Sequence, residues 1–171
     1  MLNPNSRDTL DRLVNLSAQN QTYAVRHERE KVVSATQGSE DGLFDPALPG
    51  LSLEERLCIA LYACLLTPAP ELAAEYEVRL AKLSAPVQTM AHIKNLSIHA
   101  IQDTRLQAML NFTHTLITKP ILADKQALLS LPQAGLATAE VVTLAQLISF
   151  VSYQVRLAAG LRAMLALENQ S

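Results

Sequence analysis

Apolar residues recur at helical intervals through most of the chain, and no segment shows a sustained two-residue alternation of apolar and polar positions. This pattern predicts an all-α domain. Ser6 is placed to cap a first helix, and a second helix is expected over residues 22–37, with a solvated charged face at 26–31 and with Gly38 and Gly42 marking its end. The apolar side of the first helix is formed by Leu10, Leu13, Val14 and Leu16.

The strongest helix signal lies in the following part of the chain. Residues 44–51 hold two prolines and a glycine and are expected to form a loop. Ser52 and Glu55 have the spacing of a capping box, in which each side chain accepts a hydrogen bond from the backbone amide of the other residue. All of residues 57–66 are apolar, so we expect this helix to be surrounded by others and to form the core.

Further helices are predicted in the rest of the chain. Prolines after Thr67 break the chain before the next helix. Residues 141–155 are apolar around most of the helix circumference, so a subunit interface is expected there. We expect one compact domain of about seven or eight helices over residues 1–171, with 1–20 as an N-terminal helical extension. The later helices are expected at residues 71–83, 87–101, 104–117, 124–131 and 138–167, the last with a bend at Gly160.

Composition narrows the class of partner. Of the 171 residues, 49% are hydrophobic and 18% are charged, which excludes a disordered chain. The formal net charge is −2, without the basic excess that nucleic-acid binding needs, so no nucleic acid is expected as a partner. The N-terminus shows no basic segment followed by an apolar run, so we expect a cytoplasmic protein. Residues 141–155 are shorter than the roughly 20 residues of a membrane span, and no membrane partner is expected.

The cysteines and histidines show no metal or redox pattern. Cys58 and Cys64 stand six residues apart in the apolar run, a spacing that fits neither a disulfide framework nor a zinc site. Apolar surroundings raise a thiol pKa, so both are expected to be structural, although the Thr67 hydroxyl could reach a Cys64 thiolate. His92 and His99 lack a further ligand at helical spacing, and no metal is expected. The sequence has no phosphate loop, and no cofactor is expected.

Two charged residues at the edges of the most apolar helices are candidates for function. Glu55 either closes the capping box or, at the rim of an apolar helix, has a raised pKa and transfers protons. Arg156 interrupts the apolar C-terminal helix, and a buried arginine needs a carboxylate or several carbonyl groups as partners. A pairing of Glu55 with Arg156 is therefore one hypothesis.

Several short segments follow one another in an order that is typical of a known family. They are VRHER at 25–29, GLF at 42–44, LSLEER at 51–56, LAAEYEVRL at 72–80, AGL at 134–136 and FVSYQVRLAAGL at 150–161. In this order they resemble the peroxidase-related branch of the alkylhydroperoxidase D-like and carboxymuconolactone decarboxylase superfamily, over most of the chain. The resemblance implies an all-helical, alkylhydroperoxidase D-like fold that assembles as a homodimer, trimer or hexamer.

The same resemblance bears on activity. Active members reduce organic hydroperoxides through the motif E-x(11)-C-x(2)-C-x(3)-H. Counted from Glu55, the places of the two cysteines and the histidine hold Thr67, Pro70 and Ala74, and counting from Glu54 supplies no thiol or imidazole either. Peroxide reduction needs a thiolate that attacks oxygen and a second thiol that resolves the sulfenic acid. Only the glutamate is retained.

Three functions follow, in this order of preference. The first is a family member without thiol peroxidase turnover that keeps the fold and a pocket for a small apolar ligand near Glu55, Cys64, Thr67 and Arg156. The second is an enzyme of altered chemistry, with Glu55 as general acid or base on a small apolar carbonyl compound or lactone. The third is an interaction subunit whose C-terminal apolar helix binds a redox-active relative.

Overall fold

The computed structural model describes residues 8–170, and all regular structure in this part of the chain is helical. The predicted all-helical class is confirmed, with nine α-helices among the described residues instead of seven or eight. The first half contains α1 (Thr9–Leu13), α2 (Gln21–His27), α3 (Glu30–Leu43), α4 (Leu53–Leu66) and α5 (Pro70–Lys82). The second half contains α6 (Val87–Lys94), the short 3-10 helix η1 (Ile98–Ala100), α7 (Thr104–Thr118), the 3-10 helix η2 (Pro120–Leu122), α8 (Lys125–Gln133) and α9 (Thr138–Glu168).

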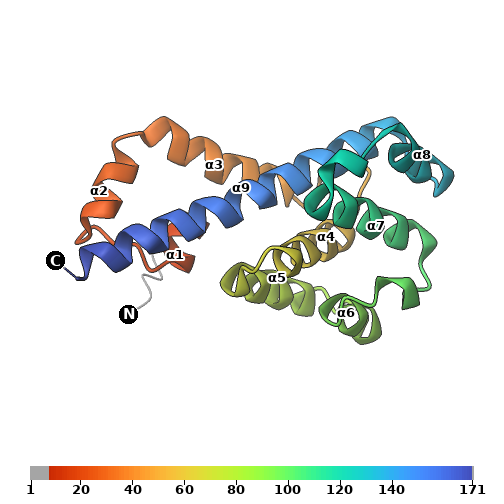
Figure 1. The fold of residues 1–171 in the computed structure, drawn as a ribbon, viewed down its shortest axis with the longest axis horizontal. Coiled ribbons are helices and arrows are strands. Elements are labelled where there is room, and N and C mark those ends of the chain that lie inside the picture. Colours follow the sequence, from red (N-terminus) through yellow and green to blue (C-terminus); the bar gives the residue numbers. More distant parts are fainter. Residues whose placement is uncertain (1–7, 171) are drawn as a thin grey trace.

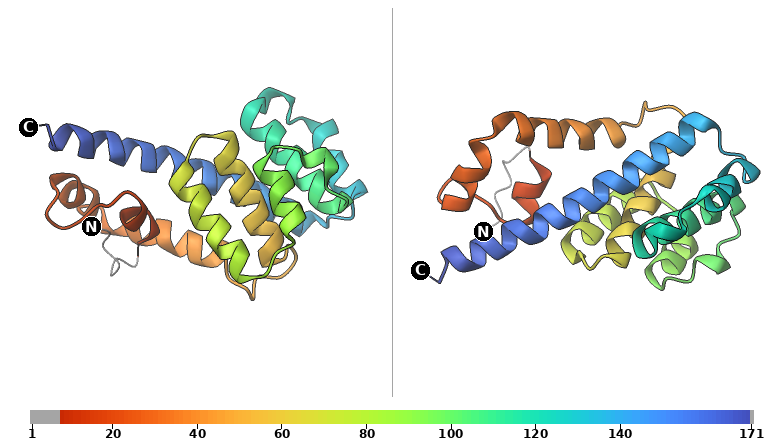
Figure 2. Two further views of the ribbon diagram at one scale, coloured as in Figure 1. Left: turned by 90° about the horizontal axis from the view of Figure 1, so that it is seen from below. Right: turned by 45° about the horizontal axis from the view of Figure 1, so that its top comes forward.

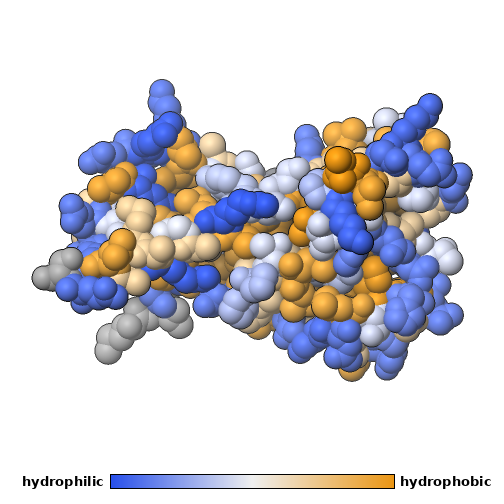
Figure 3. All heavy atoms as spheres, in the orientation of Figure 1, coloured by the Kyte–Doolittle hydropathy of each residue, from blue (hydrophilic) through white to orange (hydrophobic). Residues whose placement is uncertain are grey.

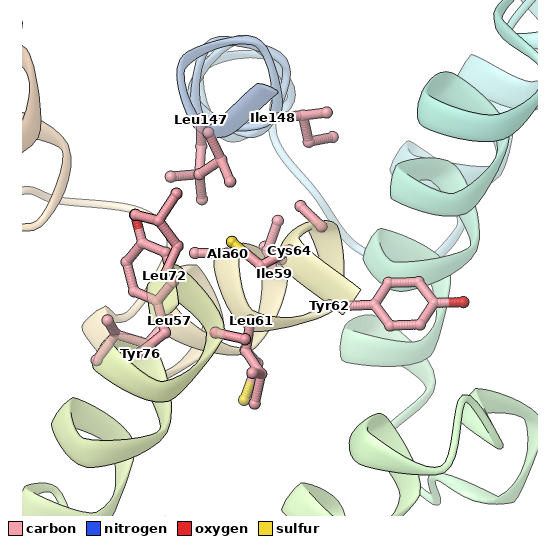
Figure 4. Close-up of a cluster of buried hydrophobic side chains, with 14 of the residues drawn as sticks. Leu57, Ile59, Ala60, Leu61, Tyr62, Cys64, Leu72, Tyr76, Leu147 and Ile148 are labelled. Carbon is pink, nitrogen blue, oxygen red and sulfur yellow. The ribbon is translucent and has the colours of Figure 1, made fainter. Parts of the chain in front are cut away.

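The core is built around α4. Every side chain from Arg56 to Cys64 is buried, as expected for a helix that is apolar all round. The helices α5, α7 and α9 pack against it. Figure 4 shows Leu147 on α9 facing this helix and Ile148 projecting from α9 on the side of α7, while Tyr62 points from α4 toward α7.

The long helix α9 runs along the whole molecule (Figures 1 and 2). Helices α4 to α8 gather around its N-terminal half, whereas α1, α2 and α3 lie along its middle and its C-terminal end. We call α1 to α3 the N-terminal arm. The arm is tied to the last turn of α9, because the Glu168 carboxylate accepts hydrogen bonds from the backbone amides of Gln21 at 2.7 Å and Thr22 at 3.1 Å.

One helix among the described residues, α9, is long and apolar enough to cross a membrane by length and composition alone. In this fold α4, α2, α3, α7 and α1 all pack against it. These neighbours cover one side, and 39% of its most apolar window is buried inside the chain. The other side of α9 is open.

The prediction of one continuous helix over residues 22–37 is wrong, because two helices cover this segment. The helix stops at His27 and restarts at Glu30, and the predicted solvated face is wrong for Arg26, whose side chain is only 7% exposed. Arg26 and His27 turn toward the acidic side chains of α1 instead of toward water. This long-range attraction overrides the local helical pattern.

The predicted end of the same helix is also wrong. The chain continues as α3 to Leu43, directly through Gly38 and Gly42. Neither glycine has a positive φ. A glycine inside a helix costs only about 1 kcal/mol relative to alanine, so it does not end a helix by itself.

Three smaller differences concern helix ends. The predicted helix over 87–101 ends at Lys94, and Leu96 then adopts a positive φ of 55°. Ser6 lies outside the described residues, and Asp8 caps α1 by accepting a hydrogen bond from the Asp11 amide. Helix α9 is one continuous helix through Gly160.

Candidate functional site

Glu55 lies in the first turn of α4, and both of its carboxylate oxygens are engaged. Its Oε2 accepts a hydrogen bond from the Ser52 amide at 2.6 Å, and the Ser52 hydroxyl accepts one from the Glu55 amide at 3.1 Å, which completes the predicted capping box. Its Oε1 accepts a hydrogen bond from Nε of Arg105 at 2.9 Å. Arg105, on α7, also binds Glu140 of α9 at 2.6 Å. Glu55 therefore joins the start of α4 to two other helices.

The predicted pairing of Glu55 with Arg156 is wrong. Arg156 is exposed, and its Nη1 donates a hydrogen bond to the Ser152 carbonyl in the preceding turn of α9. The arginine that is buried is Arg56, at 0% exposure. It meets the expectation for a buried guanidinium by donating to three carbonyl oxygens, at the end of α3 and in the loop that follows. These belong to Leu43 at 2.5 Å, Asp45 at 2.9 Å and Ser52 at 3.3 Å.

The positions of the redox motif do not assemble with Glu55. Thr67 is the C-cap of α4, Pro70 begins α5, and Ala74 is an exposed residue on α5. Glu55 is at the other end of α4, so the twelve residues to Thr67 span about 18 Å along the helix axis. The pocket that was expected near Glu55, Thr67 and Arg156 is not formed by these residues.

Both thiols are buried on α4 and are free. Burial raises the pKa of Cys58 and of Cys64 to about 12. A six-residue separation along a helix corresponds to about 9 Å of rise, whereas a disulfide needs Cα atoms closer than about 7 Å. Figure 4 shows Cys64 among the aliphatic side chains of the core. Both cysteines pack as small apolar side chains.

One hollow of the surface lies between α3 and α9. It has a volume of about 710 Å³, and none of its lining residues carries an ionisable side chain. Gly38 and Gly42 are part of its α3 side, and a methyl group added at either glycine would meet no atom within 4 Å. Both glycines therefore border open space. The remaining lining residues are Ser39, Leu43, Leu48, Thr143, Ala145, Gln146, Ser149 and Phe150.

A second, smaller hollow extends the first one along the same two helices. It shares Ser39 and Phe150 with the first and has a volume of about 340 Å³. Val32, on α3, and Tyr153, on α9, contribute apolar surface to it, and Lys31 is its ionisable cation. We call the two hollows together the α3–α9 groove.

A buried polar network connects α3 to α9. Gln154, on α9, donates a hydrogen bond from Nε2 to the Glu40 carboxylate at 2.7 Å and accepts one from the Tyr76 hydroxyl at 2.8 Å. Arg79, on α5, donates to the other oxygen of Glu40 at 3.2 Å and stacks 4.4 Å from the centre of the Phe44 ring. Burial raises the pKa of Glu40, while Arg79 and Gln154 counteract this increase. The network connects α3 of the arm to α5 and α9.

Charge distinguishes a further hollow from the groove. This hollow, of about 520 Å³, lies beside Glu40 and includes four carboxylates against the single guanidinium of Arg79. Its carboxylates belong to Glu40, Asp41, Asp45 and Glu75. Its character is strongly polar, so an apolar ligand is not expected there.

The segment around Arg26, which contributes to the family resemblance, has a structural role. Arg26 forms ion pairs with Asp11 and, at 3.1 Å, with Asp8, and Nε2 of His27 lies 2.8 Å from the Asp11 carboxylate. Tyr23 stacks on the His27 ring at 3.9 Å between centroids. These contacts hold α1 against α2.

The histidines that were weighed as metal ligands lie apart from this groove. His92 is on α6 and His99 on η1. No group of three histidine, cysteine, aspartate or glutamate side chains suited to a metal ion occurs within residues 8–170.

In comparisons with known proteins, no family model and no curated protein matches this chain.

Proposed function

We propose that the protein is a helical binding protein of the alkylhydroperoxidase-like type, without thiol peroxidase turnover, and that it binds a small apolar molecule in the α3–α9 groove. The observation that supports this function is the first hollow of the groove. Its volume of about 710 Å³ lies within the roughly 300–1,000 Å³ of small-molecule sites. Its apolar floor carries no ionisable group.

A few polar groups in the groove could orient such a ligand. The hydroxyl groups of Thr143 and Ser149 and the amide of Gln146 line it. Small-molecule sites combine a mostly apolar wall with a small number of such groups. The expected ligand is therefore neutral, largely apolar and able to form one or two hydrogen bonds.

The chemistry of the thiols and of Glu55 supports binding over catalysis. A thiol with a pKa near 12 is almost entirely protonated at neutral pH, and the thiolate is the nucleophile toward peroxides. Glu55 is held by the Ser52 amide and by Arg105, which favours the capping role over general acid or base catalysis. An enzyme that uses Glu55 on a carbonyl compound or lactone is therefore the weaker proposal.

Titration with the neutral dye Nile red tests this function. The Gly38→Leu variant places a side chain in the empty space of the groove, and we expect it to weaken dye binding at least tenfold. Its circular dichroism should stay unchanged, because leucine favours helix over glycine. Ala81→Leu, at an exposed position of α5, is the matched control and should bind like the native protein. Equal affinity in Gly38→Leu and the native chain would refute the proposal.

A further inference from the structure

The lining of the α3–α9 groove carries its charge at one end only. The first hollow, which includes Gly42 on α3 and Thr143 on α9, has no ionisable side chain that would be charged at neutral pH. The second hollow, which includes Tyr153 on α9, contains the ammonium group of Lys31. Because the two hollows share two lining residues, they form one channel with an uncharged end and a cationic end.

The two helices determine the length of this channel. Its lining extends from Lys31 to Leu43 on α3 and from Thr143 to Tyr153 on α9. At a rise of about 1.5 Å per residue, these stretches measure about 18 Å and about 15 Å. A hydrocarbon chain with staggered bonds advances about 1.3 Å per carbon, so about twelve to fourteen carbons match the channel.

The second hollow has a floor that connects the two helices. The Tyr153 hydroxyl lies 3.2 Å from the Thr36 hydroxyl, which donates its own proton to the Val32 carbonyl at 2.9 Å. Tyr153 is therefore the donor to Thr36, and this hydrogen bond lies deep in the groove because Thr36 is buried. The Tyr153 ring lies 6.5 Å from the Phe150 ring, between centroids. A ligand that extends through both hollows passes along these two aromatic rings.

Lys31 is available to an anionic group. It is exposed, and no carboxylate within residues 8–170 forms an ion pair with it. Its neighbour Glu30 lines neither hollow. Lys31 lies in the first turn of α3, where the helix dipole also favours negative charge. Toward the other end of α3, Asp41 and Asp45 belong to the acidic hollow, so an anion is favoured at the Lys31 end.

We propose that the ligand of the α3–α9 groove is a linear carboxylate of about twelve to fourteen carbons, with its chain along both hollows and its head beside Lys31. The inference rests on the proposed function and names the class of ligand. The chain is the neutral, apolar part that the first hollow indicates, and the second hollow adds an anionic head to it. The single ammonium balances one carboxylate, whereas a phosphate monoester carries a charge of about −1.5 to −2 at neutral pH.

The open side of the groove suits a ligand of this kind. Burying an ionised carboxylate in an apolar site is costly, whereas a head beside the exposed Lys31 keeps part of its water. Helix α3 runs from near one end of the molecule toward its middle (Figure 1). Figure 3 shows strongly hydrophilic side chains most densely at the two ends of the molecule, with apolar and weakly polar ones between them. The head therefore lies toward a hydrophilic end, and the chain lies toward the less polar middle.

Displacement of Nile red from the full chain by dodecanoate and by dodecanol tests the inference, because the two probes share a chain and differ in the charge of the head. Lys31→Met removes the ammonium and keeps an unbranched side chain. We expect it to lower the affinity for dodecanoate at least threefold more than that for dodecanol. Lys31→Glu brings like charges together and should widen this difference to at least tenfold. Lys82→Met, at an exposed position of α5, is the matched control and should change neither affinity.

Chain length tests the fit along the groove. The affinity of the native protein should rise from octanoate to dodecanoate, because each added methylene group buries more apolar surface. It should stop rising beyond tetradecanoate, since further carbons extend past the lining. A rise that continues at the same slope to octadecanoate would overturn the assigned length.

The outcomes separate this inference from the proposed function. If Nile red binds but dodecanoate does not displace it, the carboxylate inference is overturned and the proposed function stands. Equal losses of affinity for dodecanoate and dodecanol in both Lys31 variants lead to the same conclusion. A native protein that binds no Nile red overturns the proposed function, and the inference fails with it. Circular dichroism of each variant confirms that it is folded.

Discussion

Gln154 is a fully buried amide that joins two groups from distant parts of the chain. Its partners Tyr76 and Glu40 are 78 and 114 positions away in sequence. Thr36, Glu40 and Phe44 recur every four residues and are all buried, so they mark the buried face of α3. Their spacing does not indicate that Glu40 is paired in the core, because its partners lie on other helices.

Replacing Gln154 with leucine tests the network. Gln154→Leu keeps the volume but leaves the Tyr76 hydroxyl and one oxygen of Glu40 without their hydrogen bonds in a buried setting. We expect the free energy of unfolding to fall by about 2–4 kcal/mol. Urea denaturation measures this loss. The free energy of unfolding of the exposed control Gln126→Leu should stay within about 0.5 kcal/mol of the native value. An equal loss in both variants would show that the network does not stabilise the fold.

Glu140 makes a pH-dependent contribution to stability. Hydrogen bonding to Arg105 lowers its pKa from 4.5. A lowered folded-state pKa stabilises the protein above the unfolded value, and this stabilisation is lost as the pH falls through the folded pKa. Glu140→Gln should therefore be less stable than the native protein at neutral pH, with a gap that narrows below 4.5. Urea unfolding across this pH range measures the gap. A constant gap, or a similar one in exposed Glu28→Gln, would contradict the account.

Residue-level prediction succeeded where the determinant was local. The capping box needs only Ser52 and Glu55, three positions apart, and both of its hydrogen bonds form. The sequence predicts carbonyl or carboxylate partners for Arg156, whereas the buried arginine with carbonyl partners is Arg56, because burial depends on which loop folds over the helix. The sequence alone does not decide between capping and proton transfer by Glu55, because it does not reveal that Arg105 lies beside this carboxylate.

At the scale of elements, α4 was predictable and the α2–α3 junction was not. An uninterrupted apolar run behind a capping box specifies a central helix from sequence alone. The junction arises because Arg26 and His27 bind α1, a contact between segments that no local pattern reveals. The groove was missed for a related reason. Gly38 and Gly42 predict a helix end by their residue type, whereas both lie inside α3 and border open space.

The two kinds of glycine in this chain should respond oppositely to substitution. Gly42 lies inside α3 with space for a methyl group, so Gly42→Ala should raise the free energy of unfolding by about 0.5–1 kcal/mol. Gly135 has a φ of 87°, so Gly135→Ala should lower it by about 1 kcal/mol or more. Thermal or urea unfolding distinguishes the signs. Destabilisation by Gly42→Ala would show that α3 is not helical at that position.

The whole molecule combines a packed core around α4 with an arm that lies along α9 (Figure 1). The α3–α9 groove lies between α3 of this arm and α9. Both cysteines belong to the interior of the core, and Thr67 and Pro70 lie in the turn between α4 and α5, where the family resemblance implies redox thiols. The first hollow of the groove is accessible, and its lining carries no ionisable side chain. The central claim is therefore that this scaffold offers a ligand an apolar surface and no reactive sulfur.

Consumption of cumene hydroperoxide in the presence of dithiothreitol tests that claim most directly. The native protein is compared with a folded double variant, Cys58→Ala together with Cys64→Ala. The account predicts that both proteins leave the rate of peroxide loss at that of the reductant alone, because each thiol is buried with a pKa of about 12. Sustained turnover by the native protein that disappears in the double variant would contradict it.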